Sequence, residues 1–263
     1  MPLLRYIQRL IIVLPLLQLI SISLYADTIR LRSDAWCPYT CDPTSTTPGF
    51  LIEIAREVFK KSGHTIDYKT LNWARAIEEA RNGSIDGVVG GYKSDTLDFI
   101  FPKEPQCLAY FALFTNASDT FSYKDQKSLT AKKIGVINGY SYDEITDQAI
   151  KEKNKSYVIV AGERASEQLI KMLQAKRIDA YYENPIVFEH QLSLLGLKSS
   201  EFKNAGGPPQ QNTECYIAFS PKNPKAKLYA EILSTGMLDL RRNGTLKKIL
   251  EHYHIEDWKV KSN

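Results

Sequence analysis

Residues 72–102 constrain the fold of this chain most, because an amphipathic helix is followed there directly by a buried strand. Gly83 lies where a helix would end, since a left-handed residue after the last turn costs glycine little. The run from Ile85 to Gly91 then predicts a short buried strand. The apolar side chains of the preceding helix recur at helical spacing, at Trp73, Ala76, Ile77 and Ala80.

The end of that strand is the first candidate ligand site. Gly90 and Gly91 would let a small molecule approach the backbone closely. Ligands of open α/β sheets bind just beyond the carboxyl ends of strands. Tyr92 and Lys93 follow directly and offer an aromatic ring and a cation. A turn with a solvated lysine is the alternative.

Strands and helices alternate along the rest of the chain, which predicts an α/β fold with mainly parallel sheets. Polar connectors separate some of them, at residues 116–129 and 204–213. Apolar runs predict further strands at residues 29–31, 66–71, 99–102, 107–114, 133–137, 157–161, 178–182 and 215–220. Amphipathic patterns predict further helices at residues 50–61, 142–153, 163–175, 185–195 and 224–243, with a final short helix to about residue 253.

A weak internal repeat relates residues 80–87 to residues 173–180. Each segment ends a helix and enters a buried strand through Ile, Asp and a small residue. Two similar α/β halves would leave a cleft between them, and such clefts are preferred sites for small molecules.

The first 26 residues predict a secretory signal peptide that is cleaved after Ala26. Arg5 and Arg9 give it a basic start, and residues 10–24 are mostly apolar. An uncleaved anchor is the alternative. The remaining chain has nearly balanced charge, so nothing favours a nucleic-acid partner. No second apolar run is long enough to span a bilayer, and we expect a periplasmic monomer.

Four cysteines in an exported chain favour disulfides. Cys37 and Cys41 would close a small loop, which leaves Cys107 and Cys215 as the remaining pair. Whether this second pair bonds stays open. A zinc site is the rival reading, but no histidine has ligand spacing to these cysteines, and no metal site is expected.

Motifs in this chain follow the order of a known protein family. They lie at residues 36–39, 48–50, 73, 82–87, 133–139, 176–180, 216–219 and 243–245. In this order they resemble the family 3 periplasmic solute-binding proteins, which are the polar amino acid receptors of ABC importers. The resemblance covers essentially all of the chain after the signal peptide.

The resemblance implies a type II periplasmic binding protein fold, with two lobes and a ligand cleft between them. Lobe 1 would hold residues 27–115 plus 216–263, and lobe 2 would hold residues 116–215. The ligand would close the lobes by a hinge motion, and an inner-membrane ABC permease or a sensor would recognise the closed form. A bond between Cys107 and Cys215 would brace the hinge side of lobe 1.

This sequence departs from that family at the two charged groups that hold an α-amino acid. The family places an arginine after the focal strand to clamp the ligand carboxylate, but residues 94–99 contain none. The family places an aspartate where this chain has Asn184, and Glu183 is expected to point the other way. Lys93 is the candidate to replace the arginine, and Asn184 could hydrogen-bond an uncharged group.

The aromatic positions of the family are kept. Trp36 and Trp73 fall where it places rings around the ligand, and Tyr39, Tyr92 and Tyr182 could add hydroxyl groups. Such walls suit a flat, ring-bearing or cationic ligand, and core packing is the alternative for each ring.

Two further residues are candidates for binding an anionic group. Ser141 could offer a hydroxyl group to an anion at a helix start, with a simple N-cap as the alternative. Arg164 could reach a carboxylate across the cleft, unless it is a surface arginine.

The leading hypothesis is a non-catalytic binding protein for a small polar metabolite, amino-acid-like or a related carboxylate, without a cofactor. An exported sensing domain without a transport role is one alternative. The other is an enzyme resembling the cyclohexadienyl dehydratases, for which Glu53, Glu183 or His64 could supply acid and base groups.

Overall fold

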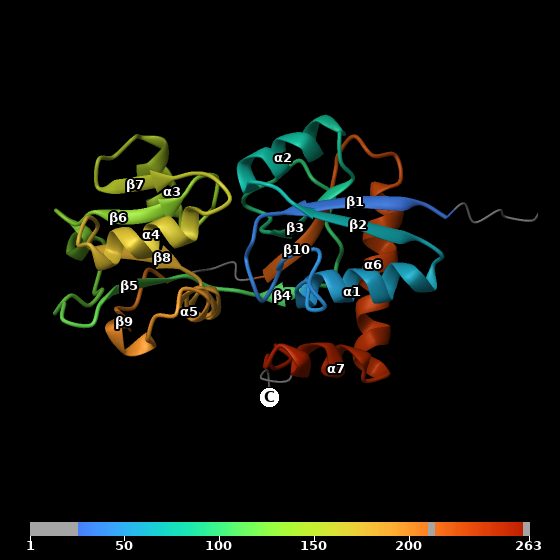
Figure 1. Ribbon diagram of the computed structural model, residues 1–263. Coiled ribbons are helices and arrows are strands. Elements are labelled where there is room, and N and C mark those ends of the chain that lie inside the picture. Colours follow the sequence, from blue (N-terminus) through green and yellow to red (C-terminus); the bar gives the residue numbers. More distant parts are fainter. Residues whose placement is uncertain (1–25, 210–213, 260–263) are drawn as a thin grey trace, which may run out of the picture.

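The computed structural model describes residues 26–209 and 214–259, so the expected signal peptide lies outside the described residues except for Ala26. Figure 1 shows two α/β lobes side by side, each built around its own sheet. Within the described ranges, no helix has both the length and the apolar character needed to cross a membrane.

The sheet of the first lobe has five strands in the order β2-β1-β3-β10-β4. β1 runs parallel to β2 and β3, whereas β10 runs antiparallel to β3 and β4. The carboxyl ends of β1 and β3 therefore lie at the same edge of this sheet. The strands are β1 Thr28–Ser33, β2 Thr65–Thr70, β3 Gly87–Gly91, β4 Cys107–Leu108 and β10 Glu214–Phe219.

The sheet of the second lobe repeats this arrangement in the order β7-β6-β8-β5-β9. β6 is parallel to β7 and β8, and β5 is antiparallel to β8 and β9. Its strands are β5 Ala112–Asn116, β6 Ile134–Ile137, β7 Tyr157–Val160, β8 Ala180–Glu183 and β9 Phe202–Asn204. The expected α/β fold with mixed, mainly parallel sheets is confirmed.

Helices cover both faces of the first sheet. In β3, Val88 packs in the cluster with α2, and the next residue, Val89, packs in the cluster with α1 and α6, so this strand is buried on both faces. The first lobe carries α1 Phe50–Lys61, α2 Trp73–Asn82, α6 Ala226–Arg242 and α7 Thr245–His252. The second carries α3 Glu144–Lys151, α4 Ala165–Gln174 and α5 Pro185–Leu194, with short 3-10 helices η1 Gln126–Leu129 and η2 Ser199–Glu201.

The helix and strand expected in residues 72–102 are both present. α2 begins after Asn72, whose side chain accepts the N–H of Arg75 at 3.4 Å. Gly83 ends the helix with a φ of 90°, a left-handed conformation that glycine adopts without strain. The buried residues of α2 are those that the periodicity predicts, Trp73, Ala76, Ile77 and Ala80.

The internal repeat has a structural meaning. The carboxylate of Asp86 accepts the N–H of Arg30, at the start of the first sheet, at 2.7 Å. The carboxylate of Asp179 accepts the N–H of Lys133, just before β6, also at 2.7 Å. Each Asp therefore links the residues just before one strand (β3 or β8) to the neighbouring strand (β1 or β6), and this contact occurs in both lobes.

Two strand predictions differ from the structure and one strand was not predicted, all near the segments that cross between the sheets. The run 107–114 is two strands, because the chain leaves the first sheet after Leu108 and joins the second at Ala112. Residues 99–102 contain only an isolated bridge from Ile100 to Phe219, next to Pro102, which has no N–H to donate. β9 was not predicted, and only its last residue, Asn204, falls in the connector expected at residues 204–213. The lobe boundaries at residues 115 and 216 stay predictions.

Both expected cysteine pairs are disulfide-bonded. Cys37 and Cys41 close the loop after β1, with Cα atoms 4.6 Å apart. Cys107 and Cys215 join β4 to β10, where they are register partners with Cα atoms 5.0 Å apart. None of the four thiols is therefore free to bind zinc, and no group of His, Cys, Asp or Glu within the described residues could hold a metal ion.

Candidate functional site

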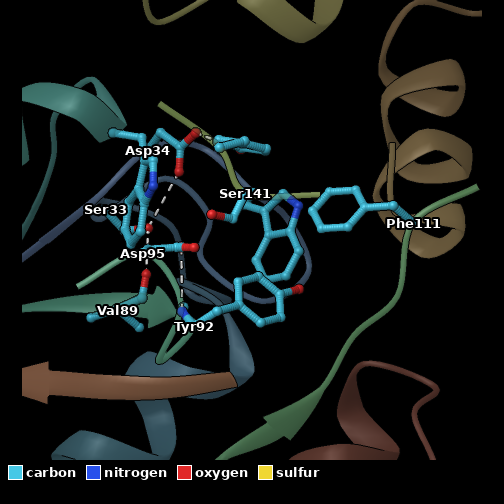
Figure 2. A pocket seen from close by; sticks show the side chains of 11 residues that line it. Ser33, Asp34, Val89, Tyr92, Asp95, Phe111 and Ser141 are labelled. Atoms are coloured by element: carbon cyan, nitrogen blue, oxygen red, sulfur yellow. Dashed lines mark hydrogen bonds between the residues drawn. The ribbon is translucent and has the colours of Figure 1, made fainter. Parts of the chain in front are cut away.

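A cavity lies at the carboxyl ends of β1 and β3, where the first lobe faces the second. It encloses about 20 Å³, the space open to the centre of a water-sized sphere, which is enough for about one water molecule. Figure 2 shows the side chains that surround it, with the ring of Phe111 across from Asp34 and Asp95. The lining residues are Ser33, Asp34, Trp36, Trp73, Val89, Gly90, Tyr92, Asp95, Phe111, Tyr140 and Ser141.

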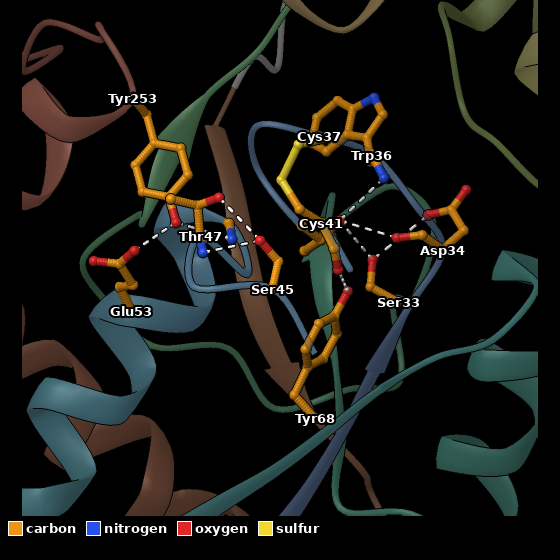
Figure 3. The surroundings of a disulfide bond; sticks show 12 residues. Ser33, Asp34, Trp36, Cys37, Cys41, Ser45, Thr47, Glu53, Tyr68 and Tyr253 are labelled. Carbon is orange, nitrogen blue, oxygen red and sulfur yellow. Dashed lines mark hydrogen bonds between the residues drawn. A yellow bond between two sulfur atoms is a disulfide. The ribbon is translucent and has the colours of Figure 1, made fainter. Parts of the chain in front are cut away.

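The position of Trp36 follows from the disulfide loop after β1 (Figure 3). The backbone N–H of Trp36 donates to the carbonyl of Thr40 at 2.9 Å, and the N–H of Thr40 donates back at 3.1 Å. The indole ring stacks on Tyr39 with centroids 4.1 Å apart. Because the bond between Cys37 and Cys41 closes this short loop, the ring is held at the cavity wall.

The two glycines at the end of β3 give room to aromatic rings of the chain itself. A Cβ atom on Gly90 would lie 3.5 Å from the Trp36 ring, and the φ of Gly90 is 93°. A Cβ atom on Gly91 would lie 3.6 Å from Cη2 of Trp73. The close approach expected for a ligand is therefore made here by two tryptophans.

Two carboxyl groups line the cavity, and both have raised pKa values. Burial raises the pKa of Asp34 to about 6, against a hydrogen bond from the hydroxyl of Tyr140 at 2.6 Å. Burial likewise raises the pKa of Asp95 to about 6, although Ser141 and the backbone N–H of Tyr92 hydrogen-bond to it. Neither carboxyl group has a cationic partner within the described residues.

Glu183, which was expected to point the other way from Asn184, also reaches the first lobe. Its Oε1 accepts the indole N–H of Trp36 at 3.3 Å and the N–H of Asn184 at 2.7 Å, and its Oε2 accepts the Tyr181 hydroxyl. The side chain is fully buried, and burial raises its pKa to about 7. The contact with Tyr181, two residues earlier in β8, is of the kind that period-two alternation predicts.

Contacts between the lobes close the cavity. The Tyr140 hydroxyl reaches Asp34, the Trp36 indole reaches Glu183, and Ser141 hydrogen-bonds to Asp95. On the same side, a Cβ atom on Gly139 would come 3.0 Å from Cβ of Ala74, at the start of α2. The structure therefore describes the lobes in contact around a small interior space.

Five of the sequence-predicted site residues line the cavity, Trp36, Trp73, Gly90, Tyr92 and Ser141. Four others are buried beside it. Tyr39 stacks beneath Trp36, and Gly91 lies under Trp73. Tyr182 stacks on Tyr142 with centroids 4.9 Å apart. Asn184 caps α5 through its side-chain oxygen, and its amide group donates to Tyr39 Oη at 3.4 Å and to the Tyr110 carbonyl at 3.1 Å.

The two cations proposed for the site lie outside the cavity. Lys93 is exposed, and its ammonium group is 4.8 Å from the centroid of the Tyr216 ring. Arg164 is exposed and pairs with Glu167 at 2.6 Å, beside an outer groove that shares Asp34 with the cavity. No Lys, Arg or His belongs to the lining residues among those that the structure describes.

The residues named for an enzyme do not line the cavity either. Glu53 accepts the hydroxyl of Tyr253, and His64 contacts Asp27 at the amino end of the first sheet. Glu183 lies behind Trp36.

Sequence reasoning missed six lining residues, Ser33, Asp34, Val89, Asp95, Phe111 and Tyr140. The rule that ligands bind at the carboxyl ends of strands would have found Ser33 and Asp34, which end β1 beside β3. Asp95 follows Tyr92 in a turn, so its position depends on the hydrogen bonds of that turn. Phe111 and Tyr140 could not be found locally, because they approach from the crossing segment and from the second lobe.

No family model matches the chain. Two curated proteins of Bacillus subtilis (strain 168) are similar over most of their length. The probable amino-acid-binding protein YxeM is 24% identical over 225 residues, which cover 84% of this chain and 81% of that protein. The L-cystine-binding protein TcyA is 20% identical over 228 residues, which cover 81% of this chain and 75% of that protein. Both names describe binding proteins.

Solved structures share the fold at low sequence identity. A histidine kinase sensor domain with similarity to periplasmic binding proteins has a TM-score of 0.71 and 18% identity, covering 86% of this chain and 95% of its own. An ancestral arginine-binding protein bound to glutamine has a TM-score of 0.69 and 19% identity, covering 88% and 99%. The chain thus has the two-lobed type II fold of the periplasmic binding proteins and is similar in sequence to amino-acid-binding proteins.

Proposed function

We propose that this chain is a family 3 solute-binding protein that captures a small polar metabolite between its lobes. The observation that carries the proposal is the cavity at the ends of β1 and β3, which is walled by residues of both lobes. Trp36, Trp73, Gly90, Tyr92 and Ser141 would contact the ligand. Four further candidates that are buried beside the cavity would hold these residues in place, namely Tyr39, Gly91, Tyr182 and Asn184.

The proposal includes a closing motion about the two crossing segments. Lobe 1 comprises residues 27–115 plus 216–263, and lobe 2 comprises residues 116–215. The space between the lobes holds about one water molecule in this arrangement. A metabolite therefore enters when the lobes separate, and the lobes then close around it less tightly than they do here. The closed form is presented to an inner-membrane ABC permease after export and cleavage behind Ala26.

A thermal-melt screen of residues 27–263 tests this function. The panel contains amino acids, their decarboxylated relatives and small carboxylates. A ligand at about 100 times its dissociation constant stabilises the folded state by about 2.7 kcal/mol, so the melting temperature rises by several degrees. Trp73→Leu removes a cavity wall and should abolish the shift, whereas Leu97→Ala changes a side chain that is 88% exposed and should keep it. Silence across all three classes would contradict the proposal.

A sensing role is the second candidate, because one neighbour with a TM-score of 0.71 is a histidine kinase sensor domain. Uptake of the identified ligand separates the two roles. A strain that lacks this protein should lose high-affinity uptake if the protein serves an importer. Normal uptake, with a changed transcriptional response to the ligand, would favour the sensing domain.

A further inference from the structure

Four hydrogen-bond donors around the cavity already serve carboxyl groups of the protein. The N–H of Tyr92 and the side chain of Ser141 both hydrogen-bond to Asp95. The hydroxyl of Tyr140 donates to Asp34 at 2.6 Å. The N–H of Tyr142 donates to Asp147 at 2.9 Å. A ligand carboxylate would therefore find these donors occupied, and would lie beside groups of its own charge sign.

The charge of the residues that line the cavity also disfavours an anionic ligand. Asp34 and Asp95 are its ionisable acids, and the described lining residues include no Lys, Arg or His. Lys93 lies over the Tyr216 ring, and Arg164 is paired with Glu167. An anionic ligand would lose its hydration here without gaining a counter-charge, whereas a cationic ligand would gain two.

Aromatic rings form most of the remaining wall, and one of them carries a hydroxyl group without a partner within the described residues. Trp36, Trp73, Tyr92, Phe111 and Tyr140 all line the cavity. The faces of such rings attract cations, most strongly where water is excluded. Tyr92 is only 7% exposed, and its hydroxyl group has no hydrogen-bond partner within the described residues. A buried phenol that lacks a partner can accept the N–H of a ligand and can also donate its own O–H, so it offers a hydrogen bond to a ligand of either charge.

A larger groove next to the cavity is also acidic. It shares Tyr92, Phe111 and Ser141 with the cavity and has a volume of about 540 Å³. Its charged residues are Asp143, Glu144, Asp147 and Lys151, so acids outnumber bases. A surface of this sign attracts cations toward the cavity and repels anions.

Resting on the proposed binding function, we propose that the ligand is a small organic cation, held by Asp34, Asp95 and the aromatic walls, that needs no carboxylate group. An amine, amidine or guanidine satisfies this description. Its N–H groups donate to the two carboxylates and to the Tyr92 hydroxyl, and its carbon skeleton packs against the tryptophans. The proposed ligand is therefore positively charged, whereas Lys93 was a candidate for holding a negatively charged carboxylate.

Calorimetric titration with matched probes tests this inference. Ethanolamine, histamine and agmatine are each compared with the amino acid that carries an added carboxylate, namely serine, histidine and arginine. Imidazolepropionate supplies the carboxylate without the ammonium group. We expect at least one amine to bind about tenfold or more tightly than its amino acid, since the carboxylate adds repulsion and an uncompensated desolvation cost.

Two isosteric variants assign the effect to the cavity. Asp34→Asn and Asp95→Asn should each weaken binding of the best amine about tenfold or more, as expected when a charge-assisted hydrogen bond is lost. Asp98→Asn is the matched control, because Asp98 lies on the same loop but is exposed and pairs with Arg81. Far-ultraviolet circular dichroism and melting of each ligand-free variant check that it remains folded.

Three outcomes would overturn the inference. The first is an amino acid or imidazolepropionate binding as tightly as its amine, a result that leaves the proposed binding function intact. The second is amine binding that survives both Asp34→Asn and Asp95→Asn. The third is absence of binding by all three amines at roughly 1 mM. The binding function itself fails only if the zwitterions, the carboxylates and the broader melting panel are also silent.

Discussion

Tyr39 and Tyr92 are both buried tyrosines near the cavity, yet their hydroxyl groups differ. The Tyr39 hydroxyl donates to the Leu108 carbonyl at 3.3 Å and receives the Asn184 amide at 3.4 Å. The Tyr92 hydroxyl has no partner within the described residues. A buried polar group without a partner keeps the cost of its lost hydration. The ligand-free protein therefore carries a local cost at Tyr92 that a ligand could remove.

Tyr92→Phe is expected to stabilise the ligand-free protein. Removing the unpartnered hydroxyl should add about 1 kcal/mol to the free energy of unfolding, which raises the melting temperature by about 2–4 °C for a chain of this size. Tyr39→Phe is the matched control and should lower the melting temperature, because it leaves the Asn184 amide without one acceptor. Calorimetric melts of both variants decide the matter. Equal losses of stability would show that the Tyr92 hydroxyl has a partner.

At the scale of elements, local patterns predicted the stretch around α2 and β3 well. The apolar spacing of α2, its stop at Gly83 and the buried β3 all depend on residues close together in the sequence. The break between β4 and β5 could not be predicted, because nothing in the apolar run 107–114 says which sheet each half joins. Such a choice is made by tertiary packing.

The same limit applies to the candidate site. Gly90 and Tyr92 were found because they end or follow a strand of the first lobe, whereas Trp36 and Trp73 were found through the family that the sequence resembles. The side chain of Lys93 lies instead over Tyr216 of β10, a contact between residues far apart in the chain. The sequence could place Lys93 after a strand, but it could not indicate which side of the strand end its side chain would occupy.

We expect the two disulfides to have different roles, one mainly in stability and the other mainly in ligand binding. The bond from Cys37 to Cys41 spans 4 residues, and the bond from Cys107 to Cys215 spans 108. In the chain-entropy account a longer closed loop constrains the unfolded state more, to about 4–5 kcal/mol at this length. The Cys107→Ala, Cys215→Ala double variant should therefore lose more stability than the Cys37→Ala, Cys41→Ala double variant.

The shorter loop should matter more for the ligand, because it holds Trp36 at the cavity wall. We expect the Cys37→Ala, Cys41→Ala variant to bind the best ligand of the melting screen several-fold more weakly. Urea unfolding and calorimetric titration, applied to both double variants, measure the two effects. The opposite assignment, with weaker binding only in the other variant, would contradict this division.

At the scale of the whole molecule, the contact between Trp36 and Glu183 links the two lobes. Glu183 is fully buried, and burial raises its pKa from 4.5 to about 7. The groups that face it are the Trp36 indole, the Asn184 N–H, the hydroxyl of Tyr181, the more distant tyrosines Tyr140 and Tyr142, and the carboxyl of Asp34. None of these is a cation. The three hydrogen bonds favour the ionised carboxylate, but burial, with a smaller contribution from Asp34, outweighs them and raises the pKa of Glu183.

The stability of the ligand-free protein should therefore depend on pH through Glu183. Because its folded-state pKa is raised, the folded state holds a proton more tightly than the unfolded state, and stability falls as pH rises from about 4.5 to about 7. Glu183→Gln cannot ionise, so its melting temperature should rise relative to the native protein over this range. Melts of both proteins between about pH 5 and about pH 8 measure the difference. A difference that is the same at every pH would exclude Glu183 as the source.

The disulfide between Cys107 and Cys215 also has a mechanical consequence. The second sheet is formed entirely from residues between these two cysteines, and α1 and α7 both lie in the first lobe. The covalent path along the chain can therefore pass from Cys107 directly to Cys215. Suppose that the protein is stretched between residue 26 and residue 259 with this disulfide intact. The first lobe and the disulfide would then bear the force, and the second lobe would bear none. Reduction would make the second lobe bear the force as well, so single-molecule extension would lengthen by the whole enclosed segment.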